Sequence, residues 1–288
     1  MVGDSHIAVI GPGAIGGTVA AWLAQAHEVT LCARTPFDAL HVETPEGAIE
    51  ARPHILVDPA AAEPVDWVLV CTKTYDAAGA ASWFAGLVGP ETRVAVLQNG
   101  VEHVARFAPF VAPARIVPAV VDIPAERDGP GRIRQRRSGT IVVPVGAEDF
   151  AALFGHCPIA VSTTGDFATV AWRKLALNCA GAVNGLTMKP AGVTHEPGIA
   201  ELMRGLVAEC VAVGRAEGAL LDAGLADEVV QHYREAPADS VNSLLADRLA
   251  GRPTEVDARN GVIARIGRRH GIAAPLNALA ATLIEAAL

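Results

Sequence analysis

Hydrophobic residues in the first half of the chain fall into short runs separated by glycine-rich or polar segments. The runs are rich in β-branched residues, and helical segments lie between several of them, an alternation typical of parallel strands buried between helices. We expect strands over residues 6–10, 28–34, 67–73, 93–100, 115–122, 132–137, 140–146 and 159–163. The Gly-Pro-Gly sequence at residues 129–131 predicts a turn between two of these strands.

The pattern changes at about Gly165. Beyond it no strand-like run occurs, and apolar residues recur at helical spacing to the end of the sequence. We expect helices over residues 167–186, 197–217, 223–235, 239–250, 254–269 and 275–287, separated at glycine or proline positions. The sequence therefore predicts an α/β fold of two domains: a Rossmann-type, doubly wound domain over residues 1–165 and an all-helical domain over residues 166–288.

Composition narrows the class of protein. Of the 288 residues, 51% are hydrophobic and 19% are charged, which is typical of a globular protein. No apolar run reaches the ~18 uncharged residues of a membrane span, and the first residues carry no signal-cleavage pattern. The five cysteines have neither paired nor metal-type spacing, and the nine histidines are scattered. We therefore expect reduced thiols, no metal site and a cytoplasmic location.

The charge distribution bears on partners. A net charge of −8 argues against a general nucleic-acid binder. We expect a small molecule as the partner and no membrane. The one basic run, residues 132–137 with four arginines, is interpreted as the solvent side of a hairpin, and a phosphate-binding role is the alternative. Sequence alone does not determine the oligomeric state, for which a homodimer is one candidate.

A glycine-rich segment directly follows the first expected strand and opens a helix. In this context the spacing of Gly11, Gly13 and Gly16 is that of a dinucleotide-binding loop. Gly11 permits the tight turn, Gly13 lets the backbone approach a pyrophosphate, and Gly16 lets the helix pack close to the strand. Ala14 and Ile15 then lie at the helix N-terminus, where N–H groups and a partial positive charge favour phosphate binding.

The end of the second strand predicts which dinucleotide is preferred. An NAD site usually has an acidic residue there, which binds the ribose 2′-hydroxyl. Here the strand ends in Arg34 with no acid, and a guanidinium matches the oxygens of a 2′-phosphate. We therefore expect NADPH as the cofactor; an ordinary surface arginine is the alternative.

Three polar residues follow two later strands of the same domain. Lys73 ends the run at 67–73, and Gln98 and Asn99 end the run at 93–100. Ligands of open α/β sheets bind beyond the carboxyl ends of the strands, on the rim that carries the glycine loop. Each residue alone is an ordinary loop residue, but together they indicate a cofactor and substrate edge.

Residues 172–178, WRKLALN, begin the helical half with a segment that is apolar on nearly every side. Such a helix is normally buried. Lys174 and Asn178 lie one helical turn apart and so share a face. A largely buried ammonium is unfavourable unless it is paired, and burial lowers its pKa towards proton-donating values. The segment alone favours a lysine that extends from a core helix to solvent, whereas the rest of the chain favours a functional lysine.

Polar residues also gather between Asp239 and Gly261. Ser243 lies near the start of one expected helix, and Thr254 is interpreted as the N-cap of the next. Glu255 would then fall in the first turn, where an acid stabilises the helix dipole or forms a surface pair with Arg259. A role in a site is the other interpretation of Glu255.

With these residues placed, the chain resembles the ketopantoate reductase (2-dehydropantoate 2-reductase) family over nearly its whole length. The resemblance is carried by GPGAIGG at 11–17, CTK at 71–73, LQNG at 97–100, WRKLALN at 172–178, GRPTEVDARNG at 251–261 and HGIAAPLN at 270–277. It implies NADPH-dependent reduction of ketopantoate to (R)-pantoate, a step towards pantothenate and coenzyme A.

The resemblance also implies roles for particular residues. Lys174 would be the general acid, supported by Glu255 as the second catalytic residue. Lys73 and Asn99 would line the cofactor and substrate site. Asn178, Ser243 and Glu255 would hold the carboxylate and hydroxyl groups of the substrate.

Two positions depart from the family pattern. Ala182 stands where a second asparagine often follows the lysine motif, with Asn184 nearby, and Ser240 replaces an asparagine near Asn242. These changes motivate an alternative in which the scaffold acts on another branched 2-keto or 2-hydroxy acid. A non-catalytic NADP(H)-binding sensor is a further alternative, although it would not require Lys174, Asn178 and the later polar residues in register.

Overall fold

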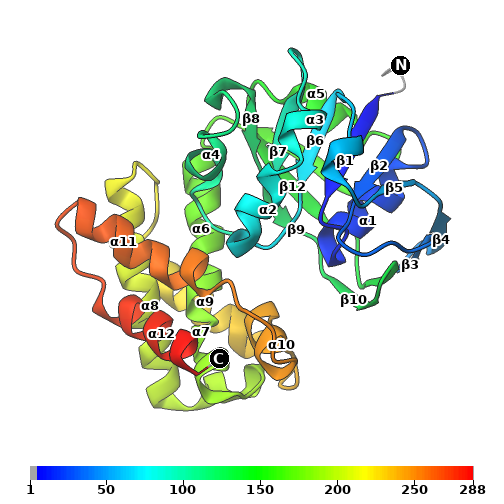
Figure 1. Ribbon diagram of the computed structural model, residues 1–288. Coiled ribbons are helices and arrows are strands. Elements are labelled where there is room, and N and C mark those ends of the chain that lie inside the picture. Colours follow the sequence, from blue (N-terminus) through cyan, green and yellow to red (C-terminus); the bar gives the residue numbers. More distant parts are fainter. Residues whose placement is uncertain (1–4, 288) are drawn as a thin grey trace. The chain divides into compact units, whose positions relative to one another are not determined.

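The computed structural model describes residues 5–287, which form two compact units (Figure 1). The first unit holds the chain up to Gln98 together with Glu102–Phe167, and the second holds Asn99–Val101 and the chain from Ala168 onward. The boundary near Phe167 lies two residues from the expected one. The sequence did not indicate that the short segment Asn99–Val101 packs with the helical unit.

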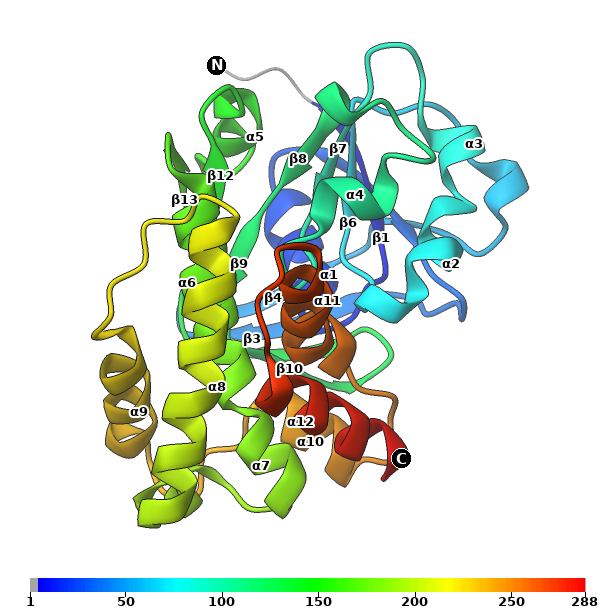
Figure 2. The ribbon, with the colours of Figure 1, turned by 90° about the vertical axis from the view of Figure 1, so that its left-hand side faces the viewer.

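The first unit is built on a six-stranded sheet in which every neighbouring pair runs parallel (Figure 2). The strand order is β5-β2-β1-β6-β7-β8, and helix α1 (Ala14–Leu23) connects β1 to β2. The strands are β1 His6–Ile10, β2 Glu28–Cys32, β5 His54–Leu56, β6 Trp67–Val70, β7 Arg93–Val96 and β8 Ile116–Pro118. The expected Rossmann-type, doubly wound domain is confirmed.

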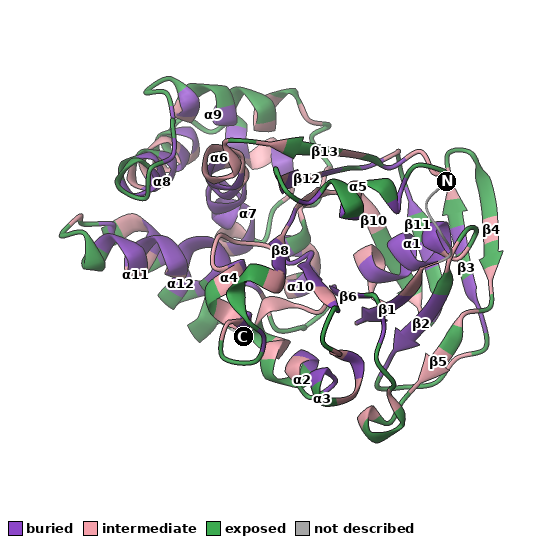
Figure 3. Cartoon of the chain, turned by 90° about the horizontal axis from the view of Figure 1, so that it is seen from above, coloured by how far each residue is buried: buried purple, intermediate pink, exposed green. Residues whose placement is uncertain are grey.

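Helices bury both faces of this sheet. Successive residues of a strand point to opposite faces, so Ile7 and Val9 of β1 join one core and Ala8 and Ile10 join the other. The remaining helices are α2 Ala77–Ala81, α3 Phe84–Leu87, α4 His103–Phe107 and α5 Glu148–Ala152. Burial on both faces explains why the central strands, buried in Figure 3, are continuous hydrophobic runs in the sequence.

Two smaller sheets complete the first unit and correct the expected strands. The run at 115–122 was expected to be one strand, but β8 ends at Pro118 and β9 (Val120–Asp122) pairs in another sheet. Ala119 donates its N–H to Val96, where the chain leaves the parallel sheet. The remaining strands are β3 Leu40–Thr44, β4 Gly47–Ala51, β10 Ala125–Gly129, β11 Arg132–Gln135, β12 Thr140–Pro144 and β13 Ala160–Thr164. Short polar strands such as β3, β4 and β10 lack the apolar runs on which the prediction relied.

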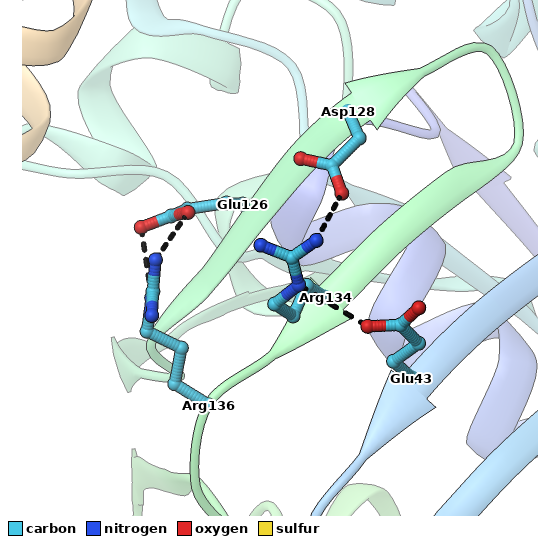
Figure 4. A network of polar contacts seen from close by, with 5 residues as sticks. All are labelled: Glu43, Glu126, Asp128, Arg134 and Arg136. Carbon is cyan, nitrogen blue, oxygen red and sulfur yellow. Dashed lines mark hydrogen bonds and ion pairs between the residues drawn. The ribbon is translucent and has the colours of Figure 1, made fainter.

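The basic run lies on a hairpin, as expected. β10 and β11 pair antiparallel, and their arginines contact carboxylates (Figure 4). Arg134 bonds both Glu43 and Asp128, each at 3.1 Å, and Arg136 binds Glu126 through two hydrogen bonds. The hydrogen bond from Arg136 lowers the pKa of Glu126. These exposed pairs add little stability.

Among the residues described after Phe167, the second unit contains helices joined by loops and no strand. Its elements are α6 Phe167–Ala180, α7 Ala182–Thr187, α8 Pro197–Ala216, α9 Leu225–Glu235, α10 Ser243–Leu249, the π-helix η5 Asp257–Gly261, α11 Val262–Arg269 and α12 Pro275–Ala286. The WRKLALN segment lies on α6, and Trp172, Leu175 and Ala176 of that segment are buried. None of the helices within residues 5–287 is long and apolar enough to cross a membrane.

Several expected helix boundaries in this unit are wrong. The helix expected over 239–250 begins only at Ser243, and tertiary contacts explain two further differences. The helix expected over 167–186 is interrupted at Gly181, whose carbonyl accepts from Asn242 Nδ2 at 3.1 Å and whose Cβ position lies 2.5 Å from Tyr233 Oη. Thr254 is not an N-cap, because regular helix begins later, and its buried Oγ1 has no hydrogen-bond partner among the described residues. Tertiary contacts therefore determine both boundaries.

Candidate functional site

The glycine loop between β1 and α1 forms a cradle that is closed on one side and open on the other. Gly11 has φ +88°, and a Cβ there would lie 2.8 Å from Thr72 Cγ2. A Cβ at Gly16 would lie 2.3 Å from the carbonyl oxygen of Gly11, whereas a Cβ at Gly13 would meet nothing within 4 Å. Ala14 and Ile15 open α1, where first-turn N–H groups lack partners within the helix. The loop therefore fits a pyrophosphate.

The carboxyl ends of β6 and β7 are joined by a side chain that sequence interpretation had assigned to a binding edge. Gln98 Nε2 donates to the carbonyl and the hydroxyl of Thr72, both at 3.0 Å, and Gln98 Oε1 accepts from Arg106. Gln98 is thus committed to holding the two strand ends. Lys73 follows Thr72 directly, so it lies on the same edge of the sheet as the glycine loop.

Arg34 follows the strand next to β1, on the surface of the first unit. Its side chain is 89% exposed, and Nη2 lies 3.7 Å from Asp76 Oδ2. An exposed ion pair of this length contributes little to stability. The guanidinium is therefore available to a stronger anion, but Asp76, which the sequence interpretation did not consider, competes for it.

In the helical unit, two residues from distant parts of the sequence form a partly buried polar pair. Asn99 Nδ2 donates to Glu255 Oε2 at 3.1 Å, and Glu255 is only 6% exposed. Glu255 precedes the helical segment, so its interpretation as a first-turn acid on a helix surface is wrong. Lys174 on α6 is half-buried.

A cavity of about 250 Å³ lies within the same unit. It is lined by Leu177, Asn178, Asn184, Ala191, His232, Tyr233, Ala236, Ser240, Val241, Asn242, Ser243 and Arg259. Arg259 Nη2 donates to Ser243 Oγ at 3.0 Å and to Asn178 Oδ1 at 3.3 Å. The structure therefore brings Asn178 and Ser243 together through an arginine. Arg259 was expected to form a surface pair, but it is 5% exposed.

The two asparagines near the departures from the family pattern also line this cavity. Asn242 Nδ2 donates to Asn184 Oδ1 and to the carbonyl of Gly181, both at 3.1 Å, and Asn242 Oδ1 caps α10 at Leu245. Asn184 Nδ2 donates to the carbonyl of Lys189. Their amide groups hold the wall of the cavity, while Ala182 is fully buried.

These features define a dinucleotide-binding α/β domain joined to a helical domain with a polar cavity. Comparison with known proteins agrees. The model of the ketopantoate reductase family PanE/ApbA matches residues 7–148, and that of its C-terminal domain matches residues 166–287. The chain belongs to the ketopantoate reductase family, and it is an oxidoreductase.

Individual relatives match over nearly the whole chain. The 2-dehydropantoate 2-reductase of Caulobacter vibrioides is 63% identical over 287 residues, which cover 98% of this chain and 99% of that one. The enzyme of the same name from Mycobacterium tuberculosis is 41% identical, covering 98% and 97%. A ketopantoate reductase structure from Ralstonia eutropha JMP134 has a TM-score of 0.90 at 31% identity, with 98% of each chain covered. A dimeric ketopantoate reductase from Staphylococcus aureus, 24% identical, shares the fold with a TM-score of 0.88 over 98% of each chain.

Proposed function

We propose that this protein catalyses the NADPH-dependent reduction of ketopantoate to (R)-pantoate, a step of pantothenate and coenzyme A biosynthesis. The observation that carries the proposal is the partly buried hydrogen bond between Asn99 and Glu255. It joins the LQNG and RPTE segments, two motifs on which the family resemblance rests. The name shared by the relatives that are 63% and 41% identical supports the same substrate.

The first unit offers most of the residues that would hold the cofactor, and Asn99 comes from the second unit. Gly11, Gly13 and Gly16 shape the loop, and Ala14 and Ile15 contribute first-turn N–H groups to the pyrophosphate. Lys73 and Asn99 are the further cofactor contacts of the proposal. When bound, the reduced nicotinamide supplies the hydride. The preference for NADPH rests on Arg34, whose exposed guanidinium matches a 2′-phosphate, and on the absence of an acid at the end of β2.

Lys174 is the proposed general acid. Reduction of a ketone builds negative charge on its oxygen, which a positioned ammonium stabilises and then neutralises by giving up a proton. Glu255, bonded to Asn99 in a buried position, orients the ammonium and the substrate hydroxyl. Asn178 and Ser243, which line the cavity, hold the polar groups of the substrate.

The test is an assay of purified protein with NADPH and ketopantoate, followed through the near-ultraviolet absorbance of the reduced cofactor. We expect turnover in the wild type and a fall of at least about 100-fold in kcat for Lys174→Ala, which should still bind NADPH. Arg173→Ala is the matched control. Arg173 lies next to Lys174 but pairs with Glu228 on the surface, so its loss should leave the rate unchanged.

Other outcomes would redirect the assignment. If ketopantoate is not reduced but a different branched 2-keto acid is, the result would support the reaction type of the family and refute ketopantoate as the substrate. NADPH binding without turnover of any 2-keto acid would favour a non-catalytic sensor. Equal rates with NADH would refute the role of Arg34. A homodimer stays a prediction, which light scattering on the same sample checks.

A further inference from the structure

Arg259 carries a buried charge that no carboxylate among the described residues pairs with. The residue is 5% exposed, and within residues 5–287 no carboxylate forms an ion pair with it. The Nη1 atom of Arg259 is buried and has no hydrogen-bond partner among the described residues. A buried charge is unfavourable unless it is paired and hydrogen-bonded. The part of the chain that the structure describes therefore contains a buried arginine whose charge it does not neutralise.

The local backbone explains why Arg259 is directed inward. It lies on the π-helix η5 (Asp257–Gly261), and its neighbours Ala258 and Asn260 are buried as well. Arg265, on the following helix, takes Asp257 as its partner instead. Single π-turns occur frequently at functional sites. The widened turn thus separates an inward arginine from an outward one that is paired.

The cavity beside Arg259 has the chemistry of an anion site. None of its lining residues is acidic. Asn178 presents a second buried donor, because its Oδ1 accepts from Arg259 while its Nδ2 has no partner among the described residues. The cavity volume of about 250 Å³ lies below the usual range for pockets that bind drug-sized ligands, which favours a small acid.

We propose that Arg259 is a specificity-determining residue that binds the carboxylate of the 2-keto acid, together with Asn178. The proposal rests on the proposed function, to which it adds a binding residue. Asn178 and Lys174 lie one turn apart on α6, with about 5–6 Å between their Cβ atoms. In a 2-keto acid the carboxylate and the ketone are on adjacent carbons. A carboxylate held by Asn178 and Arg259 therefore leaves the ketone within reach of the Lys174 ammonium.

The test compares ketopantoate with its uncharged lactone, which keeps the ketone but has no carboxylate. Arg259→Gln should raise KM for the acid about 10- to 100-fold, the expected loss of a hydrogen bond to a charged group. The same variant should change KM for the lactone less than about threefold, because the lactone offers no carboxylate to a guanidinium. Arg259→Lys keeps the charge but not the planar fork, so its KM for the acid should lie between those of the wild type and Arg259→Gln. Arg265→Gln is the matched control, with no change in the ratio of the two KM values.

A merely structural role would give a different pattern. Equal losses with acid and lactone, or unchanged KM for the acid, would overturn the proposal while wild-type turnover still supported the proposed function. If the wild type reduces neither compound, the proposed function fails, and a binding measurement then tests the anion site by itself. In that case thermal stabilisation by pantoate alone, present in the wild type and absent in Arg259→Gln, supports the anion site; equal stabilisation refutes it. If Arg259→Gln does not fold, Arg259→Lys supplies the same comparison.

Discussion

Two alanine substitutions in the glycine loop should separate its contribution to folding stability from its contribution to NADPH binding. A Cβ at Gly16 would lie 2.3 Å from the Gly11 carbonyl oxygen and 2.8 Å from Cys71 Cβ. Such distances require the strand and the helix to move apart, and overpacking of this kind costs about 1–3 kcal/mol. Alanine favours the helix by up to about 1 kcal/mol over glycine. For Gly16→Ala we therefore expect a net destabilisation of about 1–2 kcal/mol.

Gly13→Ala is the matched comparison. A Cβ there meets nothing within 4 Å, and the backbone at φ −78° is accessible to alanine. Losing a glycine at the N-cap position destabilises the protein, whereas the reduced conformational freedom of the unfolded chain stabilises it. Each effect is about 1 kcal/mol or less, so they partly cancel. The open space at Gly13 is where the backbone would approach the pyrophosphate. Gly13→Ala should therefore keep its stability and weaken NADPH binding about tenfold or more.

Calorimetry without nucleotide and fluorescence titration with NADPH measure the two effects. For a chain of this size, 1–2 kcal/mol corresponds to a fall in Tm of about 2–8 °C for Gly16→Ala. Gly13→Ala should melt with the wild type. A Gly16→Ala protein as stable as the wild type would refute the steric argument. A Gly13→Ala protein that binds NADPH normally would show that this side of the loop does not contact the cofactor.

Three further predictions concern charge. Arg34→Gln should weaken NADPH binding about tenfold and leave NADH binding unchanged, because a charge-assisted hydrogen bond to the 2′-phosphate is lost. Asp76→Asn should tighten NADPH binding, because Asp76 no longer competes for the guanidinium. The opposite change in affinity in either titration would contradict this interpretation of the ion pair. Glu255→Gln should keep the hydrogen bond from Asn99 but lower kcat at least about tenfold, whereas full activity would show that the carboxylate charge is not used. Burial lowers the pKa of His103 from 6.5 to about 4. The native state therefore favours the neutral ring, and stability that is complete above pH 6.5 should fall by up to about 3 kcal/mol as the pH drops towards 4. Urea unfolding at pH 7 and pH 4.5 checks this, and His103→Gln should show a smaller difference.

Local signals in the sequence determined much of the first unit. The strand at residues 6–10, the glycine turn and the following helix are found where they were expected. There the local preference for strand or helix agrees with burial on both faces of the sheet. Lys174 and Asn178 share one face of a core helix because helical spacing alone requires it. The family resemblance also depends on such local motifs.

Tertiary structure decided the partners of the polar residues. Helix-capping rules made Thr254 an N-cap and Glu255 a first-turn residue, and helical spacing allowed a surface pair of Glu255 with Arg259, because these rules consider only neighbours in the sequence. In the fold, Glu255 bonds Asn99 at a separation of 156 residues, and Arg259 bonds Asn178 at a separation of 81. Burial and pairing at such distances depend on how the helices pack, which local periodicity does not encode. For that reason the charge that defines the cavity was recognised only in the structure.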